Sequence, residues 1–281
     1  MRKSVATRAA ACVGAVVGAG FASGREIITF FTQYQALSWA LILISAAAMC
    51  GLYTLLSKRP PTLWRNGPVL TAVCKGFRVL LLAVTGGAMV SACGEVAALL
   101  LPVGPAYALG VLVCVGLACW LSGKSLRPLA GISWALLALL GVALVLLLAL
   151  GKEEADTALV LPEMTLPGGV RAAFFAIGYA CLNLALSVGV VCGTPGEPCD
   201  REKLRSGVCF GWIMALLMLL SNYLYLRHPT TLNATLPIVT LLSNFGYAGF
   251  LSGALVLLLA LMTSLIGVLR GLRCELVQPA Y

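Results

Sequence analysis

Three ionisable side chains lie within long apolar stretches of the chain, and they are its clearest candidates for chemistry. Arg25 and Glu26 are adjacent in the first such stretch, and Glu95 lies in the third. An isolated charge at the bilayer centre costs about 2.5 kcal/mol or more, so each group needs a partner, a water-filled cavity or neutralisation. Glu26 or Glu95 is therefore a candidate for proton coupling or for binding a substrate amine. The alternative is a structural ion pair between Arg25 and Glu95 that joins two helices.

The elements that position these groups are predicted to be membrane helices. With 60% hydrophobic residues, 10% charged residues and a mean hydropathy of +1.00, the chain is not an ordinary soluble protein. Runs such as LLALLGVALVLLLAL are apolar all round and lack the alternation of barrel strands. We expect an all-α, polytopic helical bundle in the lipid bilayer, with about eight transmembrane helices. Apolar stretches close to the roughly 20 residues that a span requires lie at 9–31, 36–56, 79–100, 102–121, 129–150, 172–192, 207–226 and 247–269.

The basic residues are distributed unevenly between the predicted loops. Only Lys152, Arg171 and Arg227 fall on the external side when the N-terminus is placed in the cytoplasm. The net charge of +9 therefore reports orientation through the positive-inside rule and not a nucleic-acid partner. We predict a multi-pass protein of the bacterial inner membrane with cytoplasmic N- and C-termini. The basic residues on the cytoplasmic side are Arg2, Lys3, Arg8, Lys58, Arg59, Arg65, Lys75, Arg78, Lys124, Arg127, Arg201, Lys203, Arg205, Arg270 and Arg273.

The sequence lacks the usual parts of a membrane-bound enzyme. Its only histidine, His228, lies in a predicted loop, and neither HExxH nor GxSxG occurs. No Walker motif is present, which argues against ATP-driven pumping. The sequence therefore predicts no enzymatic activity and no cofactor.

The loop lengths indicate two units of opposite orientation. A long linker, 57–78, follows the second predicted span, and a similar linker, 227–246, follows the seventh. Because five spans separate the two units, the second enters the membrane from the opposite face, as in inverted repeats of secondary transporters. The pattern predicts a first five-helix unit (1–150), an external linker (151–171) and a second, incomplete unit (172–281). A coincidence of loop lengths is the alternative.

The first predicted span contains four closely spaced glycines, Gly14, Gly18, Gly20 and Gly24. Each glycine weakens a helix by about 1 kcal/mol relative to alanine. An interruption of the helix is therefore expected here, and its free N–H and C=O groups would be available to a ligand. The alternative is close helix packing through small residues spaced four apart.

The counterpart of this segment in the second unit is the span 172–192, where polar Asn183 and Ser187 follow Gly178. Interrupted helices at corresponding positions of two units mark a binding site near the bilayer midplane. The candidate substrate-binding residues are accordingly Gly18, Gly20, Phe21, Ala22, Ser23, Gly24, Tyr179, Asn183 and Ser187.

The run GAGFASGREIITFF, residues 18–31, resembles the start of the YkvI-like family of bacterial membrane proteins. The resemblance implies a relationship to the LeuT-type fold of amino acid, polyamine and organocation carriers, which has two inverted units of five helices. In that fold the linker between helices seven and eight, here 227–246, folds over the external vestibule. Since Tyr281 follows the eighth predicted span, the expected architecture is a shortened LeuT-like inverted repeat.

The resemblance also implies a coupling ion. In sodium-coupled members of the LeuT-type fold, adjacent hydroxyl residues on helix eight bind Na+ together with carbonyls from the break in helix one. Thr263 and Ser264 match that position by span number and polarity. The alternative is that both hydroxyls bond carbonyls of their own preceding turn. The ion-coupling candidates for Na+ or H+ are thus Arg25, Glu26, Glu95, Thr263 and Ser264, with Thr263 and Ser264 as candidate Na+ ligands.

These features predict an ion-coupled secondary transporter of a small organic solute such as an amino acid or an amine. The competing interpretation is a non-transporting membrane scaffold or regulatory protein descended from a transporter. A homo-oligomer that compensates for the missing helices is a further expectation.

Overall fold

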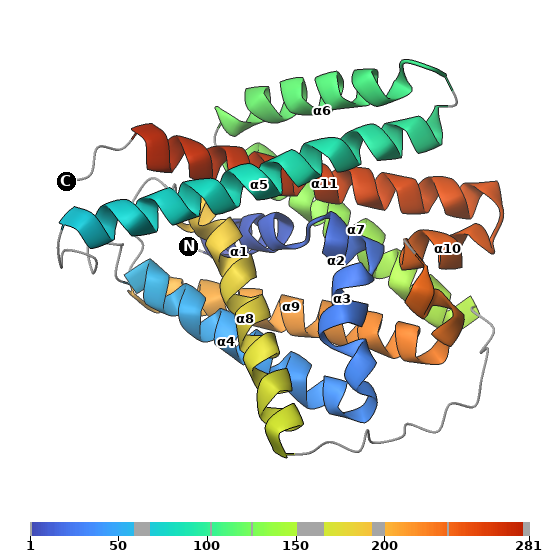
Figure 1. The fold of residues 1–281 in the computed structure, drawn as a ribbon, viewed down its shortest axis with the longest axis horizontal. Helices are drawn as coiled ribbons and strands as arrows, with labels where there is room; N and C mark the ends of the chain where they lie inside the picture. The colour runs from blue at the N-terminus through green and yellow to red at the C-terminus, as the bar shows by residue number, and fades with distance from the viewer. Residues whose placement is uncertain are drawn as a thin grey trace.

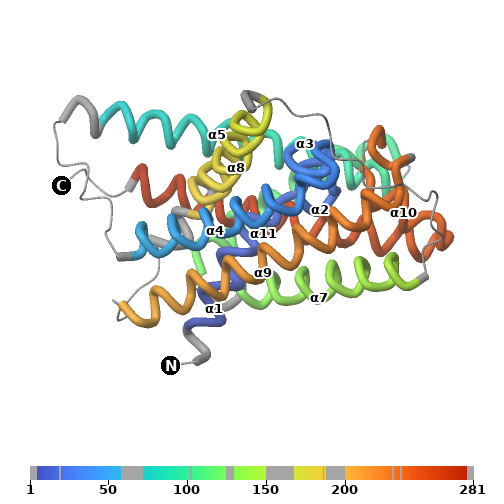
Figure 2. The backbone as a smooth tube through the Cα atoms, turned by 90° about the horizontal axis from the view of Figure 1, so that it is seen from below, coloured from blue at the N-terminus to red at the C-terminus, as the bar shows by residue number. Residues whose placement is uncertain are grey.

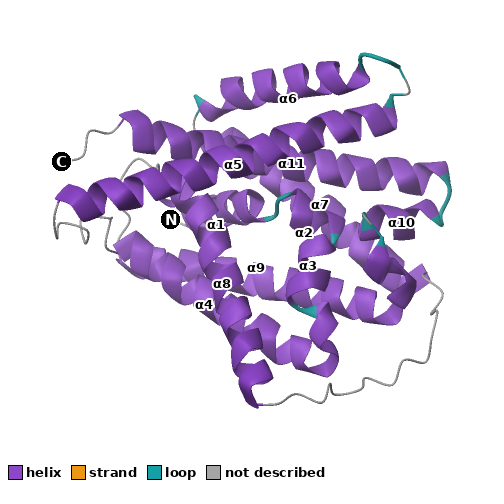
Figure 3. Ribbon diagram, in the orientation of Figure 1, coloured by secondary structure: helices purple, strands orange, loops and turns teal. Residues whose placement is uncertain are grey.

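The computed structural model describes residues 2–58, 68–101, 103–124, 126–150, 166–192, 200–234 and 236–277. These residues form helices joined by short turns, and no strand occurs among them (Figure 3). The helices are α1 (Arg2–Val16), α2 (Ala19–Ser23), α3 (Arg25–Phe30), η1 (Thr32–Leu37), α4 (Ser38–Lys58), α5 (Pro68–Leu100), α6 (Ala106–Ser122), α7 (Leu126–Leu150), α8 (Leu166–Cys192), α9 (Asp200–Arg227), η3 (Pro229–Asn233), α10 (Pro237–Ser243) and α11 (Tyr247–Val277).

Six helices in the described part of the chain are long and apolar enough to cross a membrane. They expose many large apolar side chains, as expected where lipid is the solvent. The predicted all-α polytopic membrane bundle is thereby confirmed. The six spans are Thr32–Ser57, Ala72–Leu100, Ala130–Ala149, Gly168–Ala185, Asp200–Arg227 and Tyr247–Leu276.

The two remaining predicted spans are helical but shorter. The stretch 102–121 contains α6, which has 17 residues, and the stretch 9–31 is divided among α1, α2 and α3. A total of eight transmembrane helices therefore stays a prediction.

The first part of the divided helix, α1, lies at the centre of the bundle. It packs against α7, α8, α9 and α11, whereas α2 packs against α11 and α3 packs against α8 and α9. Helix α6 lies at the periphery against α5 and α11 (Figures 1 and 2). Small buried residues of α1, such as Ala9 and Ala11, let its neighbours approach closely. At Gly14 a Cβ atom would overlap the side chain of Ser133 on α7. Close packing is thus the role of Gly14.

Four helix ends that carry basic residues lie together at one end of the bundle. The C-terminal ends of α4 and α11 and the N-terminal ends of α5 and α9 lie at the left of Figure 1. There Arg78 forms a 2.7 Å ion pair with Glu275, and Arg270 donates to the carbonyl of Lys124. The cytoplasmic location that the sequence assigns to this end stays a prediction.

The predicted linkers differ in part from the observed helix boundaries. Helix α5 begins at Pro68, inside the linker predicted for 57–78, and α8 begins at Leu166, inside the linker predicted for 151–171. Both helices carry proline in the first turn, where its missing N–H is not needed. Residues 59–67 and 151–165 lie outside the described residues. The third linker, 227–246, contains η3 and α10.

Candidate solute site

The first helix is interrupted twice, on either side of the short helix α2. At the second interruption Gly24 has a φ of +91°, a left-handed conformation that glycine adopts without steric cost. Ser23 stabilises this turn, because its hydroxyl donates to the carbonyl of Gly20 at 3.0 Å and accepts from the N–H of Arg25 at 3.3 Å. The hydroxyl of Tyr225 on α9 occupies the space where a Gly24 Cβ would lie. Residue 24 is therefore restricted to glycine by both conformation and space.

The first interruption lies against α11. The N–H of Gly18 bonds the carbonyl of Val16 at 2.7 Å, and not that of Gly14 as in a regular helix. The Gly14 carbonyl instead faces the hydroxyl of Ser264 at 3.5 Å. A Cβ on Gly18 would lie 3.1 Å from the same hydroxyl. The break in helix one and Ser264 are thus brought together, and a sodium site there stays a prediction.

Thr263 makes different contacts from Ser264. Its hydroxyl donates to the carbonyls of Leu259 and Ala260, at 3.1 and 3.0 Å, within α11. Thr263 therefore bonds the preceding turn of its own helix, which was the alternative to a role as a Na+ ligand. Both residues are buried.

Glu26 links the interrupted helix to α8. Its carboxylate lies so close to Gly20 that a Cβ on residue 20 would overlap the carboxylate. The carboxylate also accepts a 3.1 Å hydrogen bond from the hydroxyl of Tyr179. The Tyr179 ring is buried against Phe30 and Phe31, with centroid distances of 4.9 and 5.2 Å. Glu26 and Tyr179 therefore form one polar contact inside an aromatic cluster.

A cavity of about 390 Å³ lies between the interrupted helix, α5, α11 and the segment before α10. Arg25 and Glu95 both line it, as do the polar Ser23 and the backbone of Gly20. The apolar part of its wall consists of Ala92, Val96, Leu99, Leu236, Leu257 and Leu261. The cavity thus combines one cation, one anion and a hydrocarbon wall.

The predicted ion pair between Arg25 and Glu95 is wrong for this structure. The Arg25 guanidinium donates through Nη1 to the carbonyls of Leu232 and Ala234, at 3.1 and 3.4 Å. Among the described residues no ion pair within 4.0 Å joins it to Glu95, which is exposed in the cavity. These two carbonyls, at the end of η3, accept charge-assisted hydrogen bonds from the guanidinium in place of a carboxylate. The two charges line one cavity without neutralising each other directly.

The predicted interruption of the second unit is also wrong, because α8 is continuous from Leu166 to Cys192. Asn183 donates to the carbonyl of Tyr179 at 3.0 Å, and Ser187 donates to the carbonyl of Leu184 at 2.9 Å. Polar side chains satisfied inside their own helix do not break it. Neither residue lines the cavity of Arg25 and Glu95.

The other predicted substrate residues divide into two groups. Gly20 and Ser23 line the cavity, whereas Phe21 and Ala22 are buried in the core behind it. Sequence reasoning missed Tyr225, which restricts Gly24, and nearby Asn222, which donates to Ser38 at 2.8 Å. In the sequence these residues could have been noticed as two polar side chains three positions apart within the apolar stretch 207–226.

Removing the hydroxyl that binds Glu26 is expected to destabilise the bundle. Tyr179→Phe leaves the carboxylate without this donor and should lower the free energy of unfolding by about 1–3 kcal/mol. Glu26→Gln keeps an acceptor oxygen and should cost less. Unfolding in detergent, with Tyr223→Phe on the exposed face of α9 as the control, measures both changes. Equal losses in Tyr179→Phe and Tyr223→Phe would show that the hydrogen bond contributes nothing.

Comparison with known proteins agrees with the resemblance seen in residues 18–31. The chain is 25% identical to the protein named "Uncharacterized membrane protein YkvI" of Bacillus subtilis (strain 168), over 278 residues. The match covers 92% of this chain and 77% of that protein. The chain is a YkvI homologue. No protein-family model matches it.

The similarity to YkvI supports a membrane protein but assigns no activity. The name of YkvI mentions a membrane and no solute, ion or partner. The relationship to the LeuT-type fold therefore stays a prediction from the residues of the first helix.

Proposed function

We propose that the protein is an ion-coupled secondary transporter of a small zwitterionic solute of the amino acid class. The observation that carries the proposal is the cavity beside the interrupted helix, which Arg25 and Glu95 line without pairing. A zwitterion offers a carboxylate to Arg25 and an ammonium to Glu95, so both charges become paired when it binds. The apolar wall would then contact the solute side chain.

Size and position support the same proposal. A volume of about 390 Å³ falls within the roughly 300–1,000 Å³ of small-molecule sites. Gly20 of α2, between the two interruptions, lines the cavity wall. Interrupted helices also line the binding sites of many secondary transporters. Leu236, at the start of α10, closes the cavity on another side. The loop 227–246 would therefore respond to solute binding.

The proposed orientation follows the charges. The end of the bundle that holds the basic helix termini would face the cytoplasm of a bacterial cell, with both termini inside. The cavity, near the end of α5 and next to η3 and α10, would then lie toward the external side.

Sodium is the proposed coupling ion at the first interruption, with Ser264 and the Gly14 carbonyl as its nearest ligands. Sodium should raise the melting temperature above that in equal potassium, because a bound ion at 100 times its Kd stabilises the folded state by about 2.7 kcal/mol. Thr263→Ala combined with Ser264→Ala should abolish the difference. Thr240→Ala, an exposed threonine that bonds its own helix, is the control. An unchanged sodium response in the double variant would favour proton coupling at Glu26 or Glu95.

Uptake into vesicles tests transport itself. The purified protein, reconstituted into liposomes, should accumulate a radiolabelled zwitterionic amino acid when an inward sodium or proton gradient is imposed. Collapse of the gradient should release the solute. Binding without accumulation, under either gradient, would instead indicate a solute-binding scaffold or regulatory protein.

A further inference from the structure

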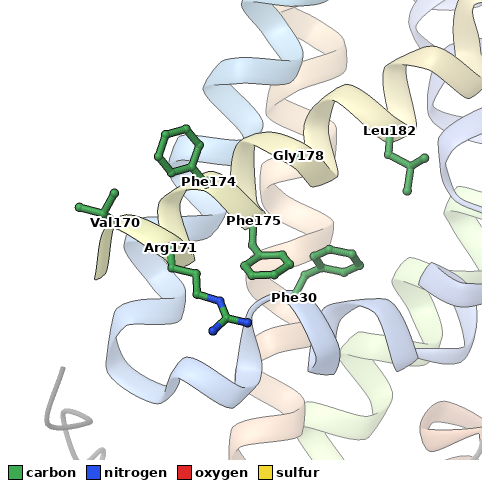
Figure 4. A pocket seen from close by; sticks show the side chains of 7 residues that line it. All are labelled: Phe30, Val170, Arg171, Phe174, Phe175, Gly178 and Leu182. Carbon is green, nitrogen blue, oxygen red and sulfur yellow. The ribbon is translucent and has the colours of Figure 1, made fainter. Parts of the chain in front are cut away.

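A second hollow lies on the outside of the bundle, away from the solute cavity. It has a volume of about 820 Å³ and runs along α8 beside the end of α3 (Figure 4). Among the described residues that line it, Arg171 is the one charged residue, and the others are Phe30, Val170, Phe174, Phe175, Gly178 and Leu182. A Cβ placed on Gly178 would meet no atom of the described residues within 4 Å, so the floor of the groove is open at this position.

The groove faces the lipid and not the protein interior. Phe174 is 72% exposed, and Phe175 and Leu182 are also exposed. All three lie within the apolar span Gly168–Ala185. In a bilayer such a concave apolar surface is surrounded by hydrocarbon chains at very high local concentration. An acyl chain is therefore the occupant that the surroundings supply.

One end of the groove carries the guanidinium of Arg171. The Arg171 guanidinium lies 5.5 Å from the centroid of the Phe175 ring, on the side of the groove near the start of α8 (Figure 4). Stacking on an aromatic ring orients a guanidinium while leaving its N–H donors free for an anion. From Arg171 to Leu182 the helix rises about 16 Å at 1.5 Å per residue. This is close to half of a hydrocarbon core of about 30 Å, so the groove matches one leaflet.

We propose that this groove binds one phospholipid, with its phosphate on Arg171 and an acyl chain along Phe174, Gly178 and Leu182. The proposal does not depend on the transport function. It has a structural consequence, however, because Phe30 contacts both the groove and the Tyr179 ring that holds Glu26. A bound acyl chain would therefore support the end of the interrupted helix.

The two features of the site can be removed separately. Gly178→Leu fills the floor of the groove, and Arg171→Gln removes the charge. Matched controls are Gly131→Leu, at an exposed helical glycine of α7 with no neighbour within 4 Å, and Arg227→Gln, whose guanidinium also stacks on a ring, that of Tyr223. Melting curves establish that each variant is folded before binding is compared.

Native mass spectrometry of the delipidated protein titrated with palmitoyl-oleoyl phosphatidylglycerol measures the binding. The wild type and both controls should retain one lipid, and Gly178→Leu and Arg171→Gln should each weaken its binding at least about tenfold. Inorganic phosphate at the same concentration should not compete, since most of the contact is apolar. Equal lipid retention in all variants would overturn the proposal. So would a wild-type dimer that Gly178→Leu dissociates, because the groove would then hold a second copy of the chain.

Discussion

Replacing Gly24 by alanine is expected to lower the free energy of unfolding by about 2–5 kcal/mol. A residue with a Cβ loses about 1–2 kcal/mol of stability when its backbone is held in the left-handed conformation, and Gly24 has that conformation. At this position the Cβ would also overlap the Tyr225 hydroxyl. Overpacking of a filled core costs about 1–3 kcal/mol more. Detergent unfolding of the two proteins measures the difference.

The two causes can be separated by a second substitution. Tyr225→Leu removes the hydroxyl and the ring atoms that the new Cβ would overlap, so adding Gly24→Ala to Tyr225→Leu should cost only the conformational part of the loss. Gly51→Ala is the matched control, because Gly51 lies within α4 with no neighbour within 4 Å and alanine favours the helix. If the Gly24→Ala protein has the same melting temperature as the wild type, helix one is not interrupted at Gly24.

Removing either charge of the solute cavity is expected to weaken zwitterion binding about 10- to 100-fold. A hydrogen bond to a charged group is worth about 1.5–3 kcal/mol, and each tenfold change corresponds to about 1.4 kcal/mol. Arg25→Gln and Glu95→Gln should therefore both raise the Kd of a zwitterionic amino acid. Calorimetric titration of the purified variants measures these changes.

The control for this pair is Arg205→Gln, which removes an exposed arginine of α9 outside the cavity. Its solute Kd should equal that of the wild type. Arg25→Gln also loses the hydrogen bonds to Leu232 and Ala234, so its melting temperature must be compared as well. If Glu95→Gln binds the zwitterion as tightly as the wild type, its carboxylate does not receive the ammonium group.

Hydropathy was sufficient to predict the bundle, because a span in lipid must satisfy its backbone internally and present apolar side chains outward. The interruption of helix one was also predictable. A glycine cluster weakens a helix wherever it occurs, and the observed breaks lie at Gly18 and Gly24. The same reasoning failed for α8, where Asn183 and Ser187 bond carbonyls of their own helix. Side-chain polarity does not say which acceptor a polar group will find.

The details of the candidate site were less accessible to sequence reasoning. An ion pair between Arg25 and Glu95 was one of two expectations for these charges, but the partners of Arg25 are backbone carbonyls at Leu232 and Ala234. Backbone acceptors carry no signature in the sequence. The contact of Tyr179 with Glu26 likewise depends on how α8 lies against α3. Such contacts follow from tertiary packing and not from spacing along the chain.

The most direct test of the solute site compares three ligands that share one side chain and differ in which of their two ends is charged. Calorimetric titration of the wild-type protein with an amino acid, its N-acetyl derivative and its amide would measure the contribution of each charged end. The cavity of Arg25 and Glu95 predicts that the amino acid binds at least about tenfold more tightly than either derivative. Equal affinity for the amino acid and one derivative, or no binding of any of the three, would contradict a zwitterion site in this cavity.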